Sequence, residues 1–497
     1  MLKDRLMDNN NQQLSVLEKV GYSLGDFAAN LVFQTLVTFI AFYYTDVFRI
    51  PASSATSIIF ICGLLGAFLF NPIIGILADR TNTRWGKFRP WILWTSIPFG
   101  VLSLLAFTTP DLDTDGKIVY AFVTYLLLLF VYSANNLPYS ALSGVITGKM
   151  KDRNSMSSYR FVAVMVAQFI IQALLLPLVL IAGDGDKALG FEIVMTYLAI
   201  IGTVCFIITF LTTKERVLPV SNKASTIAED LKDLISNIPW LIMLVVTVLV
   251  FVTLALKGGT YVYYFKDYAD KVEIASFLDG IGFNQFIAFI QTYFPNFFWP
   301  DDPATSAFSL FNGGGIIFMI IGIFFSKTLA DKFGKRNVFG ASLFASTIFV
   351  LAFYFYPKDA IGTMFVSQIL HGFFYGISTP LLWAMIADVA DYSEWKTNRR
   401  ATAIIFSAMI VGLKVGLTLG SALVTGILDA FQYDPDLLTQ SPETVNGIKL
   451  AVSVYAAIPF LLACACLFFY RINKSMENTI EGELAERRAQ GASISMA

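Results

Sequence analysis

Residues 75–87 read GILADRTNTRWGK, and residues 327–337 read KTLADKFGKRN. In both stretches an apolar run ends in Leu-Ala-Asp and passes into a short loop rich in lysine and arginine. A junction of this kind, present once in each half of the chain, indicates two copies of one helical unit. The rest of the sequence can be organised outward from these two junctions.

The composition predicts that a lipid bilayer is the solvent for most of the chain. Of 497 residues, 56% are hydrophobic and only 14% are charged, whereas soluble domains carry about 25% charged residues. The net charge of −1 argues against a nucleic-acid partner. The four cysteines have no metal-ligand spacing, and His371 is the only histidine. We therefore expect no metal, no cofactor and no enzyme chemistry.

Twelve stretches are long and apolar enough to cross a membrane. They are residues 20–48, 53–78, 91–109, 118–147, 158–182, 188–212, 239–265, 305–330, 337–356, 360–391, 401–430 and 447–471. The loops after the even-numbered spans are rich in lysine and arginine, and the opposite loops are acidic. The positive-inside rule then places both termini in the cytoplasm of a multi-pass inner-membrane protein. The N-terminal residues have no apolar core of a signal peptide.

The predicted organisation is two six-helix bundles with three additional segments. We expect an N-terminal bundle at 1–212, a cytoplasmic middle loop at 213–238, a C-terminal bundle at 239–472 with an extracytoplasmic insert at 266–304, and a cytoplasmic tail at 473–497. The aromatic, amphipathic insert is predicted to lie at the membrane interface, and a lid over the outer mouth is the alternative. Parallel six-helix repeats indicate the all-α major facilitator fold, with substrate bound between the halves near the midplane.

The two junctions also predict a cytoplasmic gate. Charge pairs at helix ends can hold this side shut and break as the two halves rock. The residues expected to form the gate are Asp79, Arg80, Arg84, Lys87, Asp331, Lys335, Arg336, Asp388, Arg399 and Arg400.

Polar side chains inside predicted spans are few, and such groups are expensive in a membrane and usually functional. Asp26, Asn30 and Gln34 are spaced by four residues and share one helix face. A sugar fits the whole set, because its hydroxyls need polar partners and its C–H faces need flat rings. The candidates are Asn30, Gln34, Asn136, Arg160, Gln168 and Lys414, with Tyr132, Tyr139, Tyr263, Tyr264 and Trp383 as rings.

Several long motifs resemble the glycoside–pentoside–hexuronide:cation symporters, the melibiose-permease-like branch of the major facilitator superfamily. They are GYSLGDFAANLVFQTLVTFIAFYYTDVF (21–48), DRTNTRWGKFRPWIL (79–93), LPYSAL (137–142) and PLLWAMIADVADYSEWKTNRRATAIIFSA (380–408). The resemblance covers about residues 18–472. It implies uptake of a sugar or glycoside coupled to Na⁺, Li⁺ or H⁺.

The functional positions of that family are only partly kept. The resemblance assigns sugar contact to Arg160 and places Lys414 near the sugar and cation sites. The family's acids on the first and fourth spans fall on Asn30 and Asn136, and its pair of cation-binding acids on the second span falls on Ala67 and Asn71. Neither alanine nor asparagine supplies the charge that offsets dehydration of Na⁺. We therefore expect H⁺ rather than Na⁺ coupling.

Three roles are open for Lys414. It can pair with Asp26 or Asp391, in which case that acid carries the proton, since a buried acid has a raised pKa and can release its proton on reaching water. It can act with Arg160 on an anionic sugar such as a uronide. It can also stand in for the bound cation, which would make the protein a facilitator.

The sequence thus predicts a secondary active transporter that imports a sugar or glycoside by alternating access. The expected partners are a small-molecule sugar, H⁺ and the lipid bilayer, and we expect a monomer. Substrate contacts are predicted at Asn30, Gln34, Asn136, Arg160, Lys414, Trp383 and Tyr264. A non-transporting sensor on the same fold is a remote alternative, because it would have lost the interior polar groups.

Overall fold

The chain is described from a computed structural model. The structure describes residues 14–147, 150–216, 235–294, 298–397 and 402–496. Within these ranges the secondary structure is helical, apart from one isolated β-bridge between Thr83 and Gly86. The bridge lies in the loop of the first repeated junction, so the predicted all-α fold class is confirmed for the described residues.

The N-terminal half contains long helices interrupted by single π-helical turns. They are α2 (Val16–Phe42), η1 (Tyr43–Val47), α3 (Ala52–Leu65), η2 (Gly66–Phe70), α4 (Asn71–Arg80), α5 (Arg89–Leu105), α6 (Thr114–Ile146), α7 (Met150–Phe169), η3 (Ile170–Leu174), α8 (Leu175–Ala182) and α9 (Lys187–Thr212). Ser15, Asp113 and Asp186 cap α2, α6 and α9 by accepting backbone N–H bonds in the first turn.

The second half repeats this arrangement with two short helices added. Its elements are α11 (Ile238–Tyr263), η4 (Tyr264–Tyr268), α12 (Lys271–Gly280), α13 (Phe283–Tyr293), α14 (Pro303–Phe333), α15 (Lys335–Ala352), α16 (Ile361–Thr397), α17 (Thr402–Ala430), α18 (Pro442–Leu450), η5 (Ala451–Tyr455), α19 (Ala456–Leu467) and α20 (Lys474–Met496). The predicted insert contains α12 and α13, and the predicted tail contains α20.

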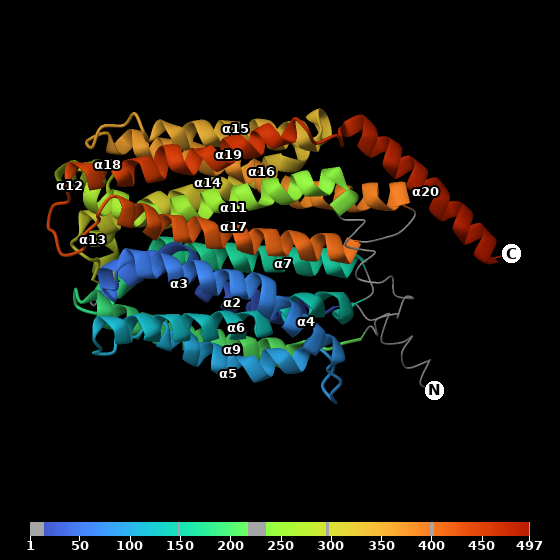
Figure 1. Cartoon of the computed structure of the whole chain (residues 1–497), viewed down its shortest axis with the longest axis horizontal. Coiled ribbons are helices and arrows are strands. Elements are labelled where there is room, and N and C mark those ends of the chain that lie inside the picture. The colour runs from blue at the N-terminus through green and yellow to red at the C-terminus, as the bar shows by residue number, and fades with distance from the viewer. Residues whose placement is uncertain (1–13, 148–149, 217–234, 295–297, 398–401, 497) are drawn as a thin grey trace. The chain divides into compact units, whose positions relative to one another are not determined.

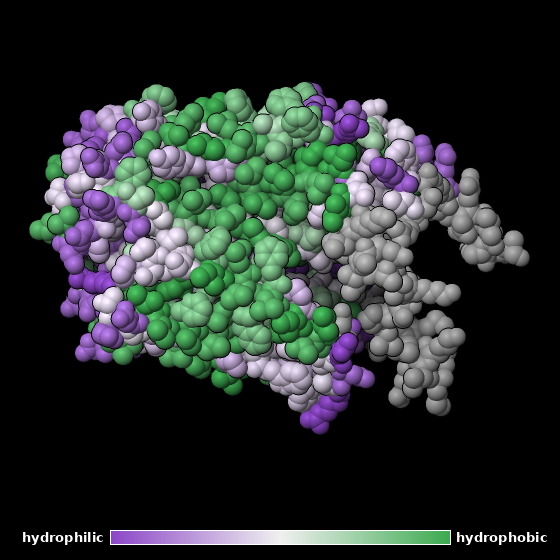
Figure 2. Space-filling model, viewed as in Figure 1, coloured by the Kyte–Doolittle hydropathy of each residue, from purple (hydrophilic) through white to green (hydrophobic). Residues whose placement is uncertain are grey.

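Ten helical segments in the described part of the chain are long and apolar enough to cross a membrane. The segments predicted at 91–109 and 337–356 are helical but shorter, with 17 residues in α5 and 18 in α15. At 1.5 Å per residue these two helices span about 26 Å, slightly less than a hydrocarbon core of about 30 Å. Figure 2 shows apolar side chains over the long helices and hydrophilic ones gathered at helix ends.

Packing divides the chain into two compact units. The first comprises Met1–Asn222, Tyr261–Gly313 and Ser421–Val445, and the second comprises Lys223–Thr260, Gly314–Gly420 and Asn446–Ala497. In the first unit α2 packs against α7 and α9, and α5 packs against α6 and α9 (Figure 1). In the second unit α15 packs against α16 and α19. One end of α14 and one end of α17 therefore belong to the first unit.

Candidate functional site

The polar face of α2 meets α7 in the first unit. Arg160 Nε donates to Asp26 Oδ2 at 2.8 Å, and the two side chains are 29% and 10% exposed. One turn further along α2, Asn30 Nδ2 donates to the Asp26 carbonyl oxygen at 2.8 Å. Gln172 Nε2 donates to Gln34 Oε1 at 3.3 Å after a further turn. The structure thus brings the predicted stripe together with the predicted arginine.

Two tyrosines form a rigid support for the Arg160 guanidinium. The rings of Tyr22 and Tyr139 stack with centroids 4.7 Å apart. Each hydroxyl donates to the backbone carbonyl of the other residue, at 3.2 Å and 2.7 Å. The guanidinium carbon lies 5.6 Å from one ring centroid and 5.5 Å from the other, within range of a cation–π interaction. Arg160 is therefore held by one charge and two ring faces.

The two asparagines of α6 differ in their surroundings. Asn135 is 1% exposed and donates from Nδ2 to Thr95 Oγ1 at 2.8 Å, which joins α6 to α5. Asn136 is half-buried. The buried residue therefore has a structural role, and the role of Asn136 as a substrate contact stays a prediction. Tyr132, two turns away from Tyr139 on the same helix, stacks with Phe33 of α2.

The positions that hold cation-binding acids in the resembled family are neutral and buried here. Ala67 lies in the π-turn η2, and Asn71 is the first residue of α4, directly before Pro72. Their exposed fractions are 1% and 7%. The helix is irregular at this place, and neither position carries a charge.

Lys414 lies on α17 between two glycines that pack against α11. A Cβ on Gly412 would lie 2.6 Å from Leu244 Cδ1, and a Cβ on Gly416 would lie 2.5 Å from the Val248 carbonyl oxygen. These glycines allow close helix approach. Lys414 is two residues from each, about 200° around the helix, so it projects from the opposite face. It is half-buried, and its predicted role is neither confirmed nor excluded by this placement.

The remaining predicted contact residues are spread over both units. Trp383 is half-buried on α16 and packs at the edge of the second unit's apolar core. Tyr264 is fully buried in η4 and stacks on Tyr268 at 4.7 Å. Asp391 is exposed near the end of α16. The roles proposed for these residues stay predictions.

A buried cluster in the second unit was not assigned a role from sequence. Lys257 Nζ on α11 lies 2.5 Å from His371 Nε2 on α16, and His371 Nδ1 lies 2.8 Å from Ser346 Oγ on α15. Lys257 is 7% exposed and His371 is 3% exposed. The sequence shows both residues as polar groups in apolar helices, but 114 residues separate them, so nothing in it indicates that they meet.

Comparison with known proteins places this geometry in a family. A family model described as MFS/sugar transport protein matches residues 21–292 and 285–474. The chain belongs to this family. It is therefore a transporter rather than an enzyme, and the resemblance to the glycoside–pentoside–hexuronide:cation symporters is confirmed at the level of the sugar-transport family.

Two relatives and one solved structure illustrate the likeness of this MFS sugar transport protein. It is 33% identical to the inner membrane symporter YicJ of Escherichia coli, over 97% of each chain. It is 31% identical to the isoprimeverose transporter of Lactiplantibacillus pentosus, over 95% of this chain and 92% of that one. A bacterial homologue of the lysosomal transporter Spinster, inward-facing and unoccupied, shares the fold with a TM-score of 0.62 and 13% identity, over 92% of this chain and 98% of that one.

The first loop of the predicted gate in this MFS sugar transport protein is held by a residue that sequence reasoning missed. Glu215 accepts the backbone N–H groups of Lys87, Phe88 and Arg89 at 2.7 to 2.9 Å, at the N-terminus of α5. A carboxylate is favoured there by the helix dipole. Arg84 instead lies over the Trp85 ring. Asp79 belongs to α4, and its side chain is outside the described part of the structure.

The second gate loop contains an ion cluster within the second unit. Lys335 Nζ donates to both carboxylate oxygens of Asp388 at 2.5 and 2.7 Å, and Glu477 of α20 lies 3.6 Å away. Asp331 is exposed, and Lys474 donates to its backbone carbonyl. Arg399 and Arg400 lie outside the described residues. The Lys335–Asp388 pair joins two predicted gate residues, and their opening and closing stays a prediction.

A third ion cluster lies in the first unit and joins η1 to η4. Sequence reasoning also missed it. Lys266 of η4 lies 2.5 Å from Asp46 Oδ1 of η1 and 2.8 Å from the hydroxyl of Tyr433. That hydroxyl donates to Asp46 at 2.8 Å. The Tyr263 hydroxyl lies 2.7 Å from Thr45 Oγ1. These contacts tie η1 to η4 and to the segment after α17.

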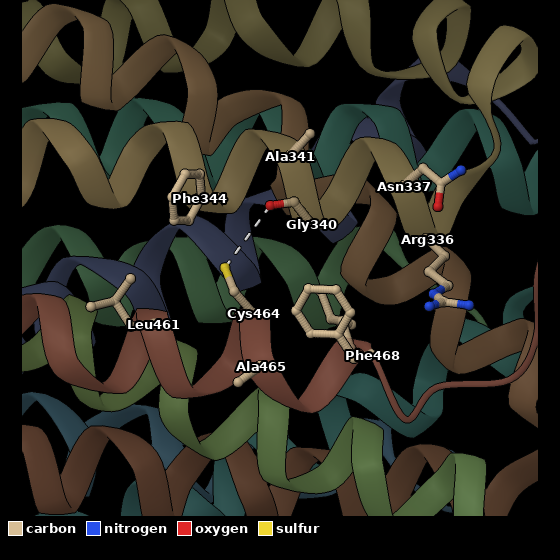
Figure 3. A pocket seen from close by; sticks show the side chains of 10 residues that line it. Arg336, Asn337, Gly340, Ala341, Phe344, Leu461, Cys464, Ala465 and Phe468 are labelled. Carbon is tan, nitrogen blue, oxygen red and sulfur yellow. Dashed lines mark hydrogen bonds between the residues drawn. The ribbon is translucent and has the colours of Figure 1, made fainter.

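One groove on the second unit does not fit a sugar. Its volume is about 510 Å³, and it lies between α15 and α19 (Figure 3). The lining side chains are mostly apolar, among them the exposed Phe344 and Phe468, with Arg336 and Asn337 at one end. Such a surface matches acyl chains better than hydroxyl groups. Among the described residues, no group of three or more His, Cys, Asp or Glu side chains is placed to hold a metal ion.

Proposed function

We propose that this protein imports a neutral sugar or glycoside in symport with H⁺, by alternating access of its two helical halves. The observation that carries the proposal is the half-exposed polar face of α2, where Asn30, Gln34 and the Arg160–Asp26 pair lie beside stacked aromatic rings. Amides and a fixed guanidinium can bind hydroxyls, and ring faces suit sugar C–H groups.

The Arg160–Asp26 pair favours a neutral substrate over an anionic one. The carboxylate already neutralises the guanidinium at 2.8 Å, and breaking a partly buried pair costs several kcal/mol. An anionic sugar would have to displace Asp26 and leave that charge unpaired. A sugar hydroxyl can instead accept from the remaining guanidinium N–H groups while the pair stays intact.

The neutral second span supports H⁺ as the coupling ion. Na⁺ in a dehydrated site gains most of its free energy from carboxylate oxygens, and Ala67 and Asn71 provide none. An amide cannot carry a proton either, so the proton site is expected elsewhere in the chain. We further propose that both termini are cytoplasmic, as the lysine- and arginine-rich loops indicate, and that the monomer is the working unit.

The test is transport by purified protein in sealed vesicles. A panel of labelled isoprimeverose, methyl glycosides, pentosides and a glucuronide is offered under an imposed pH gradient, an imposed Na⁺ gradient, or neither. We expect accumulation of a neutral glycoside that follows the pH gradient and is indifferent to Na⁺. Accumulation driven by Na⁺ alone would contradict H⁺ coupling, and gradient-independent equilibration would identify a facilitator. Exclusive uptake of the glucuronide would contradict a neutral substrate.

A further inference from the structure

The cluster of Lys257, His371 and Ser346 joins three helices of the second unit. Lys257 Nζ and His371 Nε2 are 2.5 Å apart, and the other ring nitrogen of His371 lies 2.8 Å from Ser346 Oγ. Ser346 is fully buried. Both imidazole nitrogens therefore have a partner, which fixes the orientation of the ring and leaves Nε2 directed at the amine.

The pairing of two bases limits how many protons the cluster can hold. With an ammonium group on Lys257, Nζ–H donates to an unprotonated Nε2, and Nδ1–H donates to Ser346. A second proton would place two positive charges at hydrogen-bond distance inside a helix bundle, where charge is poorly solvated. Two groups this close titrate as one unit. The pair therefore alternates between one added proton and none.

The surroundings of the Lys257–His371 pair make its protonation sensitive to the entry of water. The His371 ring lies parallel to Tyr375 of α16 and Phe460 of α19, at 6.0 and 6.4 Å. Gly372 packs against Gly315 of α14. Burial opposes the charged form, so a change of solvent access at the cluster changes its proton affinity.

Titratable side chains on the helices packed around the pair include Tyr375 of α16, which stacks on the His371 ring at 6.0 Å, and Tyr261, one turn after Lys257 on α11. Lys414 projects from the face of α17 opposite its contact with α11. Arg336 of α15 and Asp388 of α16 are 10 and 17 residues along their helices from the cluster, about 15 and 25 Å.

We propose that Lys257 and His371 together form the proton-binding site of this transporter and carry one H⁺ in each cycle. This inference rests on the proposed function, in which H⁺ is the coupling ion. The proton is taken from water on the outer side onto the amine–imidazole pair, and it is released to water on the cytoplasmic side. No bond other than N–H forms or breaks.

Because His371 is the only histidine, its protonation can be followed directly. The full chain is labelled with ¹⁵N-histidine, purified through a tag without histidine, and titrated in lipid from about pH 5 to about pH 10, which spans the usual histidine and lysine range. We expect one imidazole signal set that changes in a single transition, and Lys257→Gln should move its midpoint by more than about one pH unit. Imidazole chemical shifts that stay constant over this pH range would contradict the proposed proton site. A transition in Lys257→Gln with the same midpoint as in the wild type would contradict it as well.

A transport assay separates this site from the proposed function. In vesicles with the panel glycoside that gives the fastest counterflow, His371→Gln and Lys257→Gln should each lose pH-driven accumulation about tenfold or more while keeping sugar–sugar exchange, which requires no net proton movement. Retained exchange also shows that each variant is folded. The matched control is Thr253→Val, which removes a buried, non-titratable hydroxyl one turn before Lys257 on α11 and should leave coupling unchanged.

The outcomes of this assay are distinct. If the wild type accumulates sugar with the pH gradient and His371→Gln does so equally well, the site is wrong and H⁺ symport stands. If the wild type shows no response to pH, the proposed function itself fails. If a single variant does not fold, the other member of the pair and the isotope titration still decide the question.

Discussion

The two halves of this transporter each hold a cation among their helices, but they give it opposite partners. In the N-terminal half Arg160 faces the carboxylate of Asp26 and two stacked tyrosine rings. In the C-terminal half Lys257 faces the imidazole of His371, another base. A guanidinium beside a carboxylate keeps its charge at every accessible pH. An amine beside an imidazole gains and loses a proton. The first arrangement suits a fixed substrate contact, and the second suits a coupling site.

The largest effect is expected when the fixed cation of the N-terminal half is removed. Arg160→Gln should reduce both exchange and accumulation by about 100-fold or more, because it removes the proposed sugar contact and leaves Asp26 buried without its partner. Counterflow of the panel glycoside measures this effect. Arg160→Lys is the matched control and should recover only part of the activity, since an ammonium lacks the planar fork. Full exchange in Arg160→Gln would remove Arg160 from the site.

A double-mutant cycle measures how strongly Asp26 interacts with Arg160. Asp26→Asn should reduce counterflow about tenfold, and Asp26→Asn with Arg160→Gln should be less destabilised than the two single changes added together. The expected coupling free energy is about 1 to 3 kcal/mol, measured from thermal unfolding in detergent. Additive losses would show that the 2.8 Å contact contributes no stabilising interaction.

The missing acids of the second span provide a gain-of-function test. Ala67→Asp with Asn71→Asp introduces the two carboxylates that the resemblance assigns to these positions, at a π-turn and the start of α4. Uptake should then respond to Na⁺, by several-fold at least, while Asn71→Gln as the neutral control should not respond. Uptake measured with and without an Na⁺ gradient decides the matter. A Na⁺ response in the unmodified protein would show that its cation site lies elsewhere.

The smallest effect is expected at the half-buried ion cluster of Lys335, Asp388 and Glu477. Burial raises the pKa of Glu477, the Asp388 carboxylate acts in the same direction, and Lys335 opposes both. A group whose pKa is raised in the folded state contributes stability at low pH that is lost as pH rises through the folded pKa. Glu477→Gln should therefore raise the melting temperature at neutral pH by about 1 °C and have no effect in acid. A lower melting temperature at neutral pH would contradict this sign.

The sequence predicted the fold better than it predicted the site. Apolar runs and charged loops located most helices to within about five residues, because length and hydropathy are local properties. The exceptions are α7, which begins at Met150 rather than 158, and α16, which ends at Thr397 rather than 391. The stripe of Asp26, Asn30 and Gln34 followed from helical spacing. By contrast, Lys257 and His371, or Asp46 and Lys266, come from helices far apart in sequence, and their contact depends on helix rotation and packing that no local pattern encodes.

The same dependence on helix rotation and packing explains why some residues could not be given their full role from sequence. Asn135 and Asn136 are adjacent, yet only the rotation of α6 decides that Asn135 is buried against Thr95 while Asn136 is half-buried. Glu215 looks like an ordinary loop acid until the chain brings it to the N-terminus of α5. Tyr264 is a candidate ring for sugar contact in the sequence, and the structure places it fully buried in η4.

The central claim is that the first half binds the substrate and the second half binds the proton. The most direct test is to record sugar-induced proton movement together with sugar exchange in the same vesicles. The wild type should take up protons when the transported glycoside is added. His371→Gln should keep exchange and lose proton uptake, whereas Arg160→Gln should lose both. Proton uptake that persists in His371→Gln, or exchange that persists in Arg160→Gln, would contradict a substrate site in the first half and a proton site in the second.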